Sequence, residues 1–255
     1  MRKFTDIEYH AGGGNSRSLD LYLPEGSGFP VFVFFHGGGI ERGDKAGEAC
    51  ATVLPEYFTS KGIAFASANY RMYPAARYPD YVLDAAEAVA WVRNNICDYG
   101  GDGRVIVGGS SAGGYLSMML CYDKSFLGKW GIEPHGITAF VHDAGQPTTH
   151  FNIVKLEYGL DRRRVIVDEK APLYHIGEAA EYAPQLFFVS DNDIGNRYEQ
   201  TVLIIGTLKD LGYDMDRVEL RYMEGYSHTR YLGMTDEKGV SIFGTLAYDF
   251  LKKYL

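Results

Sequence analysis

The sequence predicts an α/β fold in which a mostly parallel sheet of about eight strands carries helices on both faces. The chain has 255 residues, of which 46% are hydrophobic and 23% are charged, a size and balance typical of one globular domain. Apolar runs typical of strands alternate with segments of helical periodicity, as in parallel sheets covered by helices. We therefore expect a single domain over residues 1–255.

The strands are predicted from short runs rich in β-branched and aromatic residues. A Gly-rich turn separates the first two runs, so we expect them to pair as an antiparallel hairpin at the edge of the sheet. The eight predicted strands are Phe4–Tyr9, Leu19–Leu23, Val31–Phe35, Ile63–Asn69, Val105–Gly109, Ile137–His142, Leu186–Ser190 and Val218–Met223.

The helices are predicted from apolar residues at intervals of three and four. The clearest helix spans Asp80–Asn94, and its apolar face carries Val82, Ala85, Val89 and Val92. The other predicted helices are Ala46–Lys61, Tyr115–Tyr122, Arg197–Leu211 and Val240–Tyr254.

The segment Ala144–Ala183 has no clear period and contains three consecutive arginines. A long irregular segment inside an α/β domain is usually functional or mobile. Two interpretations stay open: a small cap insertion over the active site, or a solvated connection with one helix.

Composition limits the partners. The formal net charge of −8 disfavours nucleic acid. No apolar run approaches the roughly 20 residues of a membrane span, and the N-terminus lacks the apolar stretch of a signal peptide. Cys50, Cys97 and Cys121 are odd in number and lack metal-ligand spacing, so we expect free thiols. These features predict a cytoplasmic protein without membrane or nucleic-acid partners and leave open a homo-oligomer.

The sequence Gly109–Gly114 carries a G-x-S-x-G motif between a predicted strand and a predicted helix. That context is typical of a nucleophile elbow, a sharp turn that needs small neighbours around the serine. Ser111 would stand at a helix N-terminus, where backbone N–H groups favour a developing oxyanion. The plain alternative is an ordinary strand–helix turn. We expect Ser111 to be a nucleophile.

The sequence His36-Gly37-Gly38-Gly39 directly follows the predicted strand Val31–Phe35. Consecutive glycines cost conformational entropy, which is offset where backbone must approach a ligand closely. The pattern is typical of the loop that completes an oxyanion hole, whereas a flexible surface loop is the alternative. We expect the His36 imidazole to hold this loop rather than act as a base.

A serine nucleophile needs a general base and a carboxylate that orients the base. In the expected order of serine, acid and histidine, His228 is the one histidine after the acidic candidates Asp191 and Asp193. We favour Asp193, because the loop must leave the sheet before it reaches back to the imidazole.

The remaining predicted site residues concern substrate. Ser110 precedes the nucleophile, His142 lies near a strand end, and Tyr174 offers a ring for stacking, so we expect all three to line the pocket. The spacing of His142, Asp143 and His150 does not make a metal site, and the chemistry needs neither metal nor cofactor.

Together these motifs resemble the hormone-sensitive-lipase and carboxylesterase-like branch of the α/β-hydrolases, close to small bacterial acetyl, cinnamoyl or feruloyl esterases. The resemblance spans roughly residues 18–255 and implies that the amides of Gly38, Gly39 and Ala112 form the oxyanion hole. It also implies that Arg71 and Asp84 are a structural pair. The matching pieces are His36–Gly39, Asn69-Tyr70-Arg71 with Pro74, Tyr78-Pro79 before Asp84-Ala85, Gly109–Gly114, Ala171-Pro172-Leu173, Asp193 and His228.

Three positions depart from the family pattern. Ser110 stands where an acidic residue is frequent, and Ser190 and Thr229 stand where glycine is usual. The resemblance implies a serine carboxylesterase that hydrolyses short-chain or aromatic acyl esters, including esters of carbohydrate, through an acyl-enzyme. An amide hydrolase of the arylformamidase type and a non-catalytic small-molecule receptor are the alternatives on the same fold.

Overall fold

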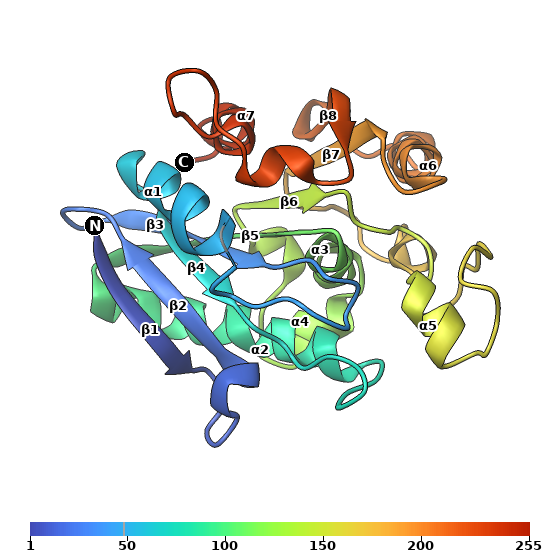
Figure 1. The fold of residues 1–255 in the computed structure, drawn as a ribbon, viewed down its shortest axis with the longest axis horizontal. Helices are drawn as coiled ribbons and strands as arrows, with labels where there is room; N and C mark the ends of the chain where they lie inside the picture. Colours follow the sequence, from blue (N-terminus) through green and yellow to red (C-terminus); the bar gives the residue numbers. More distant parts are fainter. Residues whose placement is uncertain (48) are drawn as a thin grey trace.

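The computed structural model describes residues 1–47 and 49–255, and eight strands of these residues form one sheet (Figure 1). The strand order is β1-β2-β4-β3-β5-β6-β7-β8. Only β2 runs against its neighbours, and the other adjacent strands are parallel. The predicted sheet and its N-terminal antiparallel hairpin are therefore confirmed. The strands are β1 (Arg2–Glu8), β2 (Ser18–Leu23), β3 (Phe29–Phe35), β4 (Ala64–Ala68), β5 (Gly101–Ser110), β6 (Ala139–Asp143), β7 (Gln185–Asn192) and β8 (Val218–Ser227).

Helices cover both faces of the sheet, as predicted (Figure 1). Helices α1 and α7 pack on one face, where Phe58 and Phe243 join a buried cluster with strand residues. Helices α2, α3, α4 and α6 pack on the other face. The helices are α1 (Leu54–Ser60), α2 (Asp80–Asn95), α3 (Ala112–Tyr122), α4 (Lys124–Gly128), α5 (Phe151–Leu156), α6 (Arg197–Asp210) and α7 (Ile242–Leu251).

Short helical turns connect these elements. A π-helical turn, η2 (Ala49–Val53), precedes α1. The 3₁₀ turns are η1 (Gly14–Arg17), η3 (Ile96–Tyr99), η4 (Pro134–Gly136), η5 (Pro172–His175), η6 (Met215–Arg217) and η7 (Arg230–Gly233). Within the described residues, no helix has both the length and the apolar character needed to cross a membrane.

The largest error in the predicted helices concerns the range 46–61, which the sequence assigned to one helix. Glu48 lies outside the described residues, and the α-helix begins only at Leu54. Pro55 occupies the first turn of α1, where its missing N–H costs no intrahelical hydrogen bond. The residues directly before α1 form the π-helical turn η2 (Ala49–Val53), so the predicted range contains a π-helical turn followed by a short α-helix.

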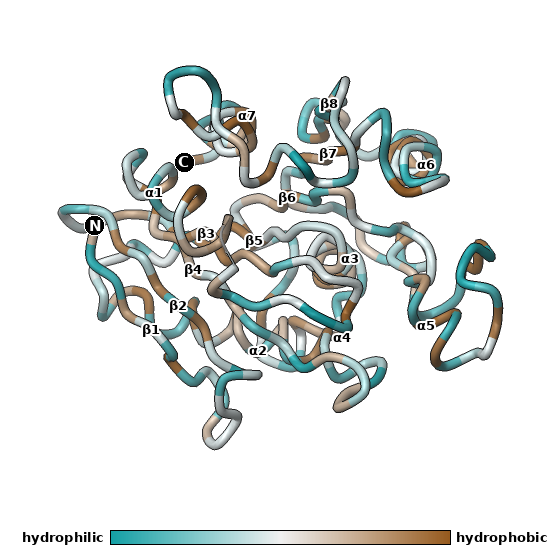
Figure 2. Tube along the Cα trace, in the orientation of Figure 1, coloured by the Kyte–Doolittle hydropathy of each residue, from teal (hydrophilic) through white to brown (hydrophobic). Residues whose placement is uncertain are grey.

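The central strands are the most apolar part of the chain, and every residue of β3 is buried. Figure 2 shows hydrophobic residues along these strands, whereas many outer loops are hydrophilic. In the parallel register, Phe35 lies opposite Gly109, and Gly109 lies opposite His142. The loops that follow β3, β5 and β6 therefore leave the sheet at the same edge, which is where ligands bind in open α/β sheets.

The segment 144–183 connects β6 to β7 and contains α5 and η5. Internal hydrogen bonds hold it together: the Lys170 ammonium donates to Glu157 at 3.0 Å, and the Thr149 and Tyr158 hydroxyls donate to Asp168, each at 2.7 Å. The Tyr115 hydroxyl of α3 donates to the Lys170 carbonyl at 2.7 Å, which ties the segment to the core.

Candidate active site

Ser111 occupies the turn between β5 and α3 with φ 55° and ψ −109°, a conformation that is uncommon for a residue with a side chain. The turn is tight on both sides. A Cβ atom at Gly113 would lie 1.9 Å from the Phe35 carbonyl oxygen, and one at Gly109 would lie 2.5 Å from the Gly113 carbonyl. Glycine is required at both positions, which explains the G-x-S-x-G spacing.

The structure brings Ser111, His228 and Asp193 together. The His228 Nε2 lies 2.8 Å from the Ser111 Oγ, and its Nδ1 lies 2.6 Å from an Asp193 carboxylate oxygen. Ser111 follows β5, Asp193 follows β7 and His228 follows β8, so the three come from carboxyl ends of parallel strands. Both distances are within the reach required for proton transfer from a hydroxyl to a histidine base.

The Asp193 side chain is 2% exposed, yet it is held in its charged form. Burial alone would raise the pKa of Asp193. The hydrogen bond and charge of His228, the Ile194 amide and the charge of Arg197 outweigh burial and leave this pKa below its usual value. An anionic Asp193 can orient His228 and stabilise the imidazolium form.

Asp191 makes different contacts from Asp193. Its carboxylate accepts hydrogen bonds from the Gly225 amide at 3.0 Å and from the Asn192 amide at 2.9 Å. These bonds tie together the ends of β7 and β8. Of the two candidate acids, the structure joins Asp193 to the histidine.

The glycines after β3 form a strained loop beside Ser111. Gly38 has φ +116°, and a Cβ atom there would lie 1.9 Å from the Arg42 carbonyl oxygen. The Glu41 and Arg42 amides both donate to the Gly38 carbonyl at 3.2 Å, which closes a tight turn. A Cβ atom at Gly37 would lie 3.2 Å from the Ser111 Cβ, so this loop passes directly beside the serine.

Three amides were expected to form an oxyanion hole. Gly38 and Gly39 line the same cavity as Ser111. Ala112 begins α3, and the first N–H groups of a helix have no acceptor within it. These positions are compatible with the expected hole.

His36 lies under the glycine loop. Its ring stacks on Tyr70 with 4.6 Å between centroids, its Nδ1 lies 2.7 Å from the Gly37 carbonyl, and the Tyr70 hydroxyl donates to the His36 carbonyl at 2.8 Å. Burial lowers the pKa of His36, which favours a neutral imidazole. Nearby, Arg71 donates two hydrogen bonds of 2.8 Å to Asp84.

Comparison with known proteins gives the relatives of this chain. The BD-FAE family model matches residues 19–129. Isoprenylcysteine alpha-carbonyl methylesterase ICME of Arabidopsis thaliana is 36% identical over 235 residues, which cover 83% of this chain and 53% of that protein. Esterase LipC of Mycobacterium tuberculosis is 37% identical over 91 residues, which cover 35% of this chain and 22% of LipC. The chain thus spans about half or less of the length of these curated relatives.

Solved structures match nearly the whole chain. A truncated form of a carbohydrate esterase from gut microbiota superposes with a TM-score of 0.78 at 17% identity, covering 100% of this chain and 96% of that one. Esterase B from Lactobacillus rhamnosis also gives 0.78, at 16% identity, covering 99% and 86%. These likenesses show that the chain has the α/β-hydrolase fold of these esterases.

The cavity at Ser111 has a volume of about 570 Å³, within the range of small-molecule sites. Leu232, Ile194 and Phe151 give it apolar surface, whereas Glu41, Arg42 and Arg162 give it charge. Ser111, His228 and the glycine loop all line this cavity. The site is therefore small and mixed in polarity.

Of the three residues expected to bind substrate, only Ser110 lines this cavity. His142 is 1% exposed and packs in the core against Phe187, with its Nδ1 2.8 Å from the Ser117 hydroxyl. It lies on a strand face that points into the helix layer, so the prediction for His142 was wrong. Tyr174 is 55% exposed, packs against His175 and does not line the cavity. The prediction that Tyr174 lines the pocket was therefore wrong too.

The departures from the family pattern have structural consequences. Thr229 adopts φ 54°, the left-handed conformation in which glycine carries no Cβ penalty. Ser190 is buried, and its hydroxyl donates to the Ser227 carbonyl at 3.2 Å. The two residues therefore shape the loops that present His228 and Asp193.

Sequence reasoning missed Asn152 of α5. Its side-chain amide donates to the Gly39 carbonyl at 2.6 Å and to a Glu41 carboxylate oxygen at 2.7 Å. Asn152 thus connects the segment 144–183 to the glycine loop. No motif marks this asparagine, because the contact joins positions 113 residues apart.

Asp143, at the end of β6, has a supporting role that the sequence did not indicate. Its carbonyl accepts the Ser111 amide at 2.7 Å, and its fully buried carboxylate accepts a hydrogen bond from the Tyr231 hydroxyl. Burial raises the pKa of Asp143 to about 6, despite that hydrogen bond. Asp143 therefore holds the turn that carries Ser111 through its backbone carbonyl.

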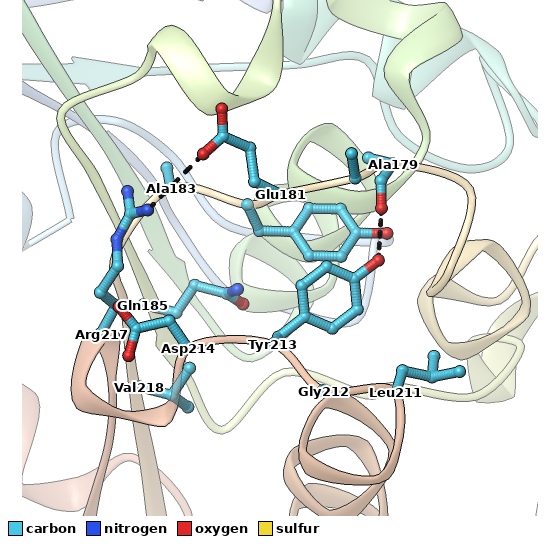
Figure 3. A pocket seen from close by; sticks show the side chains of 12 residues that line it. Ala179, Glu181, Ala183, Gln185, Leu211, Gly212, Tyr213, Asp214, Arg217 and Val218 are labelled. Carbon is cyan, nitrogen blue, oxygen red and sulfur yellow. Dashed lines mark hydrogen bonds and ion pairs between the residues drawn. The ribbon is translucent and has the colours of Figure 1, made fainter.

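A different cavity, of about 490 Å³, lies where β7 and β8 begin and is lined by residues such as Gln185 and Val218 (Figure 3). Figure 3 shows the Tyr213 hydroxyl bonded to the Ala179 carbonyl at its edge. Because Ser111 lies at the opposite ends of the parallel strands, this cavity is separate from the candidate active site. In the described residues, no group of three or more His, Cys, Asp or Glu side chains is placed to hold a metal.

Proposed function

We propose that this protein is a serine carboxylesterase that hydrolyses short-chain or aromatic acyl esters, including esters of carbohydrate, through an acyl-enzyme. The observation that carries the proposal is the continuous hydrogen-bonded series from Ser111 through His228 to Asp193, which opens into a cavity beside the glycine loop. The named esterases among the relatives support the same chemistry.

In the first half of the reaction, His228 accepts the proton of Ser111 as the Ser111 Oγ attacks the ester carbonyl carbon. The amides of Gly38, Gly39 and Ala112 stabilise the oxyanion, each by roughly 3 kcal/mol. Asp193 stabilises the His228 cation. His228 then protonates the departing alcohol, and the acyl group remains on Ser111.

In the second half, water takes the place of the alcohol. His228 removes a proton from the water, which attacks the acyl carbonyl, and the oxyanion occupies the same amides. His228 returns the proton to the Ser111 Oγ as the acid is released. All proton transfers in this cycle use residues of this chain.

The lining of the cavity supports small acyl groups and hydrophilic alcohols. A long acyl chain is favoured by about 0.8 kcal/mol for each methylene that enters an apolar groove. Three charged residues, Glu41, Arg42 and Arg162, interrupt the apolar surface here. The segment 144–183 contributes Phe151, Asn152 and Arg162 to the lining, so we propose that it acts as a small cap.

A cytoplasmic location is also proposed. Cys50 and Cys121 are buried as free thiols, and Cys97 is an exposed free thiol. Free thiols of this kind suit a reducing compartment.

The acyl preference is tested by kcat/KM on p-nitrophenyl acetate, butyrate, octanoate and palmitate. We expect the highest values for acetate or butyrate and a decline at octanoate. Values that rise to octanoate or beyond would replace the short-chain proposal with a lipase. Hydrolysis of a matched p-nitroanilide faster than the ester would favour an amide hydrolase.

A further inference from the structure

A smaller cavity adjoins the one at Ser111 and is lined by four arginines. Its volume is about 290 Å³. Phe151, Arg162 and Ile194 line both cavities, so the two share a wall. A substrate bound at Ser111 could therefore extend into the second cavity, named here the arginine cavity after its cationic residues Arg162, Arg163, Arg164 and Arg197.

The charges of the arginine cavity are only partly balanced. Arg163 donates several hydrogen bonds to Asp161, which neutralises its charge. Neither Arg162 nor Arg164 forms an ion pair with any residue in the described part of the chain. The residues that line the cavity include no carboxylate. Within residues 1–47 and 49–255, two guanidinium groups of the arginine cavity therefore have no acidic partner.

Arg162 is also oriented. Its guanidinium carbon lies 4.2 Å from the centroid of the Phe151 ring, a cation–π contact that restrains the position of the group. A guanidinium in contact with an aromatic ring can still donate N–H groups to an acceptor such as a carboxylate. The apolar surfaces of Phe151 and Ile194 can contact the linker between that acceptor and the ester.

Arg197 closes the inner side of the arginine cavity. It is 3% exposed, and its Nη1 donates to the Ala144 carbonyl at 3.0 Å. Burial lowers the pKa of Arg197 to about 10, so the guanidinium remains charged at neutral pH. It belongs to the first turn of the 14-residue helix α6, the end at which the helix dipole also favours an anion.

This concentration of positive charge is opposite in sign to the whole molecule, whose formal net charge is −8. An overall negative field repels anions, so a local cluster of arginines is needed to bind one. We propose that the arginine cavity binds an anionic group of the substrate, so that the enzyme prefers esters that carry a carboxylate in addition to the scissile bond. The inference rests on the proposed esterase activity and adds its substrate class.

The test compares anionic esters with neutral isosteres. One pair carries the carboxylate on the acyl side. Its anionic member is the p-nitrophenyl monoester of adipic acid, and its neutral member keeps this ester and has a primary amide in place of the free carboxylate. A second pair carries it on the alcohol side: 4-carboxyphenyl butyrate and 4-carbamoylphenyl butyrate. For each pair, the readout is the ratio of kcat/KM for the anionic ester to kcat/KM for the neutral ester. Comparing this ratio between variants removes the intrinsic reactivity of each ester.

The variants are Arg162→Gln with Arg164→Gln, and Arg93→Gln as the matched control, because Arg93 is exposed on α2 and does not line either cavity. For at least one pair, we expect the ratio to fall at least about fivefold in the double variant at low salt, and to stay within twofold in the control. A loss in the acyl pair or in the alcohol pair identifies which side enters the arginine cavity.

A double-variant ratio within twofold of the wild type in both pairs would overturn the inference while leaving the esterase proposal intact. An equal fall in Arg93→Gln would also overturn it, because the effect would then follow the net charge. If the wild type hydrolyses none of the four esters, the proposed function fails and this inference fails with it.

Discussion

At the scale of single residues, the arrangement of Ser111, His228 and Asp193 depends on which carboxylate holds the imidazole. Asp193 lies 2.6 Å from the His228 Nδ1, whereas Asp191 bonds to loop amides. An orienting carboxylate keeps the imidazole in the tautomer that can accept the serine proton. The two acids therefore predict different losses when each is neutralised.

Asp193→Asn should lower kcat on p-nitrophenyl acetate by at least about 10², because an amide at this position holds the wrong imidazole tautomer. Asp191→Asn is the matched control and should keep kcat within about tenfold, because it alters only a surface loop contact. Circular dichroism of both variants checks the fold. A larger loss in Asp191→Asn would move the orienting role to that residue.

Asp143 makes a prediction about stability and pH. Its pKa is about 6 in the folded protein and is close to 3.8 when unfolded, so the folded state binds the proton more tightly. The stability contribution of Asp143 therefore falls as pH rises from about 4 to 6, by about 2 to 3 kcal/mol in total. The neutral amide of Asp143→Asn resembles the protonated carboxyl group. The stability of this variant should therefore not fall between pH 4 and 6.

The measurement is the free energy of unfolding in urea for wild type and Asp143→Asn at several pH values. We expect the free energy of unfolding of the variant, relative to that of the wild type, to increase between pH 4 and 6. At pH 8 the variant should be more stable by about 2 kcal/mol. A difference that stays constant from pH 4 to 8 would contradict a buried, proton-linked carboxylate.

Several residue roles could be read from the sequence because they follow from local chemistry. The G-x-S-x-G spacing reflects clashes at Gly109 and Gly113, which depend on neighbours only a few residues away or on the next strand. His142 was misassigned because the face on which a strand residue points depends on register. Tyr174 was misassigned because the course of an irregular segment is set by tertiary contacts.

At the scale of elements, the glycine loop after β3 is the most constrained part of the site. Gly38 combines φ +116° with a predicted 1.9 Å contact between an added Cβ and the Arg42 carbonyl. Any side chain at this position must displace the loop that carries the Gly38 and Gly39 amides. The loop is also tied to α5 through Asn152, so its position depends on two elements.

Gly38→Ala should lower kcat on p-nitrophenyl acetate by about 10² or more, the loss associated with one oxyanion donor. Gly62→Ala is the matched control: Gly62 also has positive φ, +74°, but an added Cβ would meet nothing within 4 Å. The control should lose only about 1 kcal/mol of stability and keep its kcat. Equal kinetic losses in both variants would show general destabilisation rather than loss of oxyanion donors.

The elements themselves were predictable to different degrees. All eight strands were found, because each is a short apolar run with β-branched or aromatic residues between turn residues. The range 46–61 was predicted as one α-helix, whereas the structure has the π-helical turn η2 followed by α1, a difference in hydrogen bonding that apolar periodicity does not distinguish. Helix α5 was not located, since six residues give too little periodicity to identify.

At the scale of the whole molecule, the parallel sheet brings together side chains that are far apart in sequence. Ser111 and His228 are separated by 117 residues, and His228 and Asp193 by 35. The only basis for predicting from the sequence that these residues lie close together is the rule that ligand sites form at the carboxyl ends of parallel strands. The same topology separates this site from the cavity at the start of β7 and β8.

The contribution of the segment 144–183 is a property of the whole molecule and could not be predicted in detail. Its sequence identified an irregular region with three consecutive arginines, and the structure shows where they lie relative to Ser111. The Asn152 side chain joins this segment to the glycine loop, and Arg162 contacts Phe151 within the segment. Such contacts have no local signature, because both partners are determined only by the complete fold.

The most direct test of the account is the loss of p-nitrophenyl acetate hydrolysis in Ser111→Ala compared with Ser110→Ala, its neighbour in the same turn. If Ser111 is the nucleophile, Ser111→Ala lowers kcat/KM by at least about 10³, whereas Ser110→Ala keeps kcat/KM within about tenfold. A folded Ser111→Ala variant that retains most of the wild-type activity, or an equal loss in Ser110→Ala, would contradict the assignment.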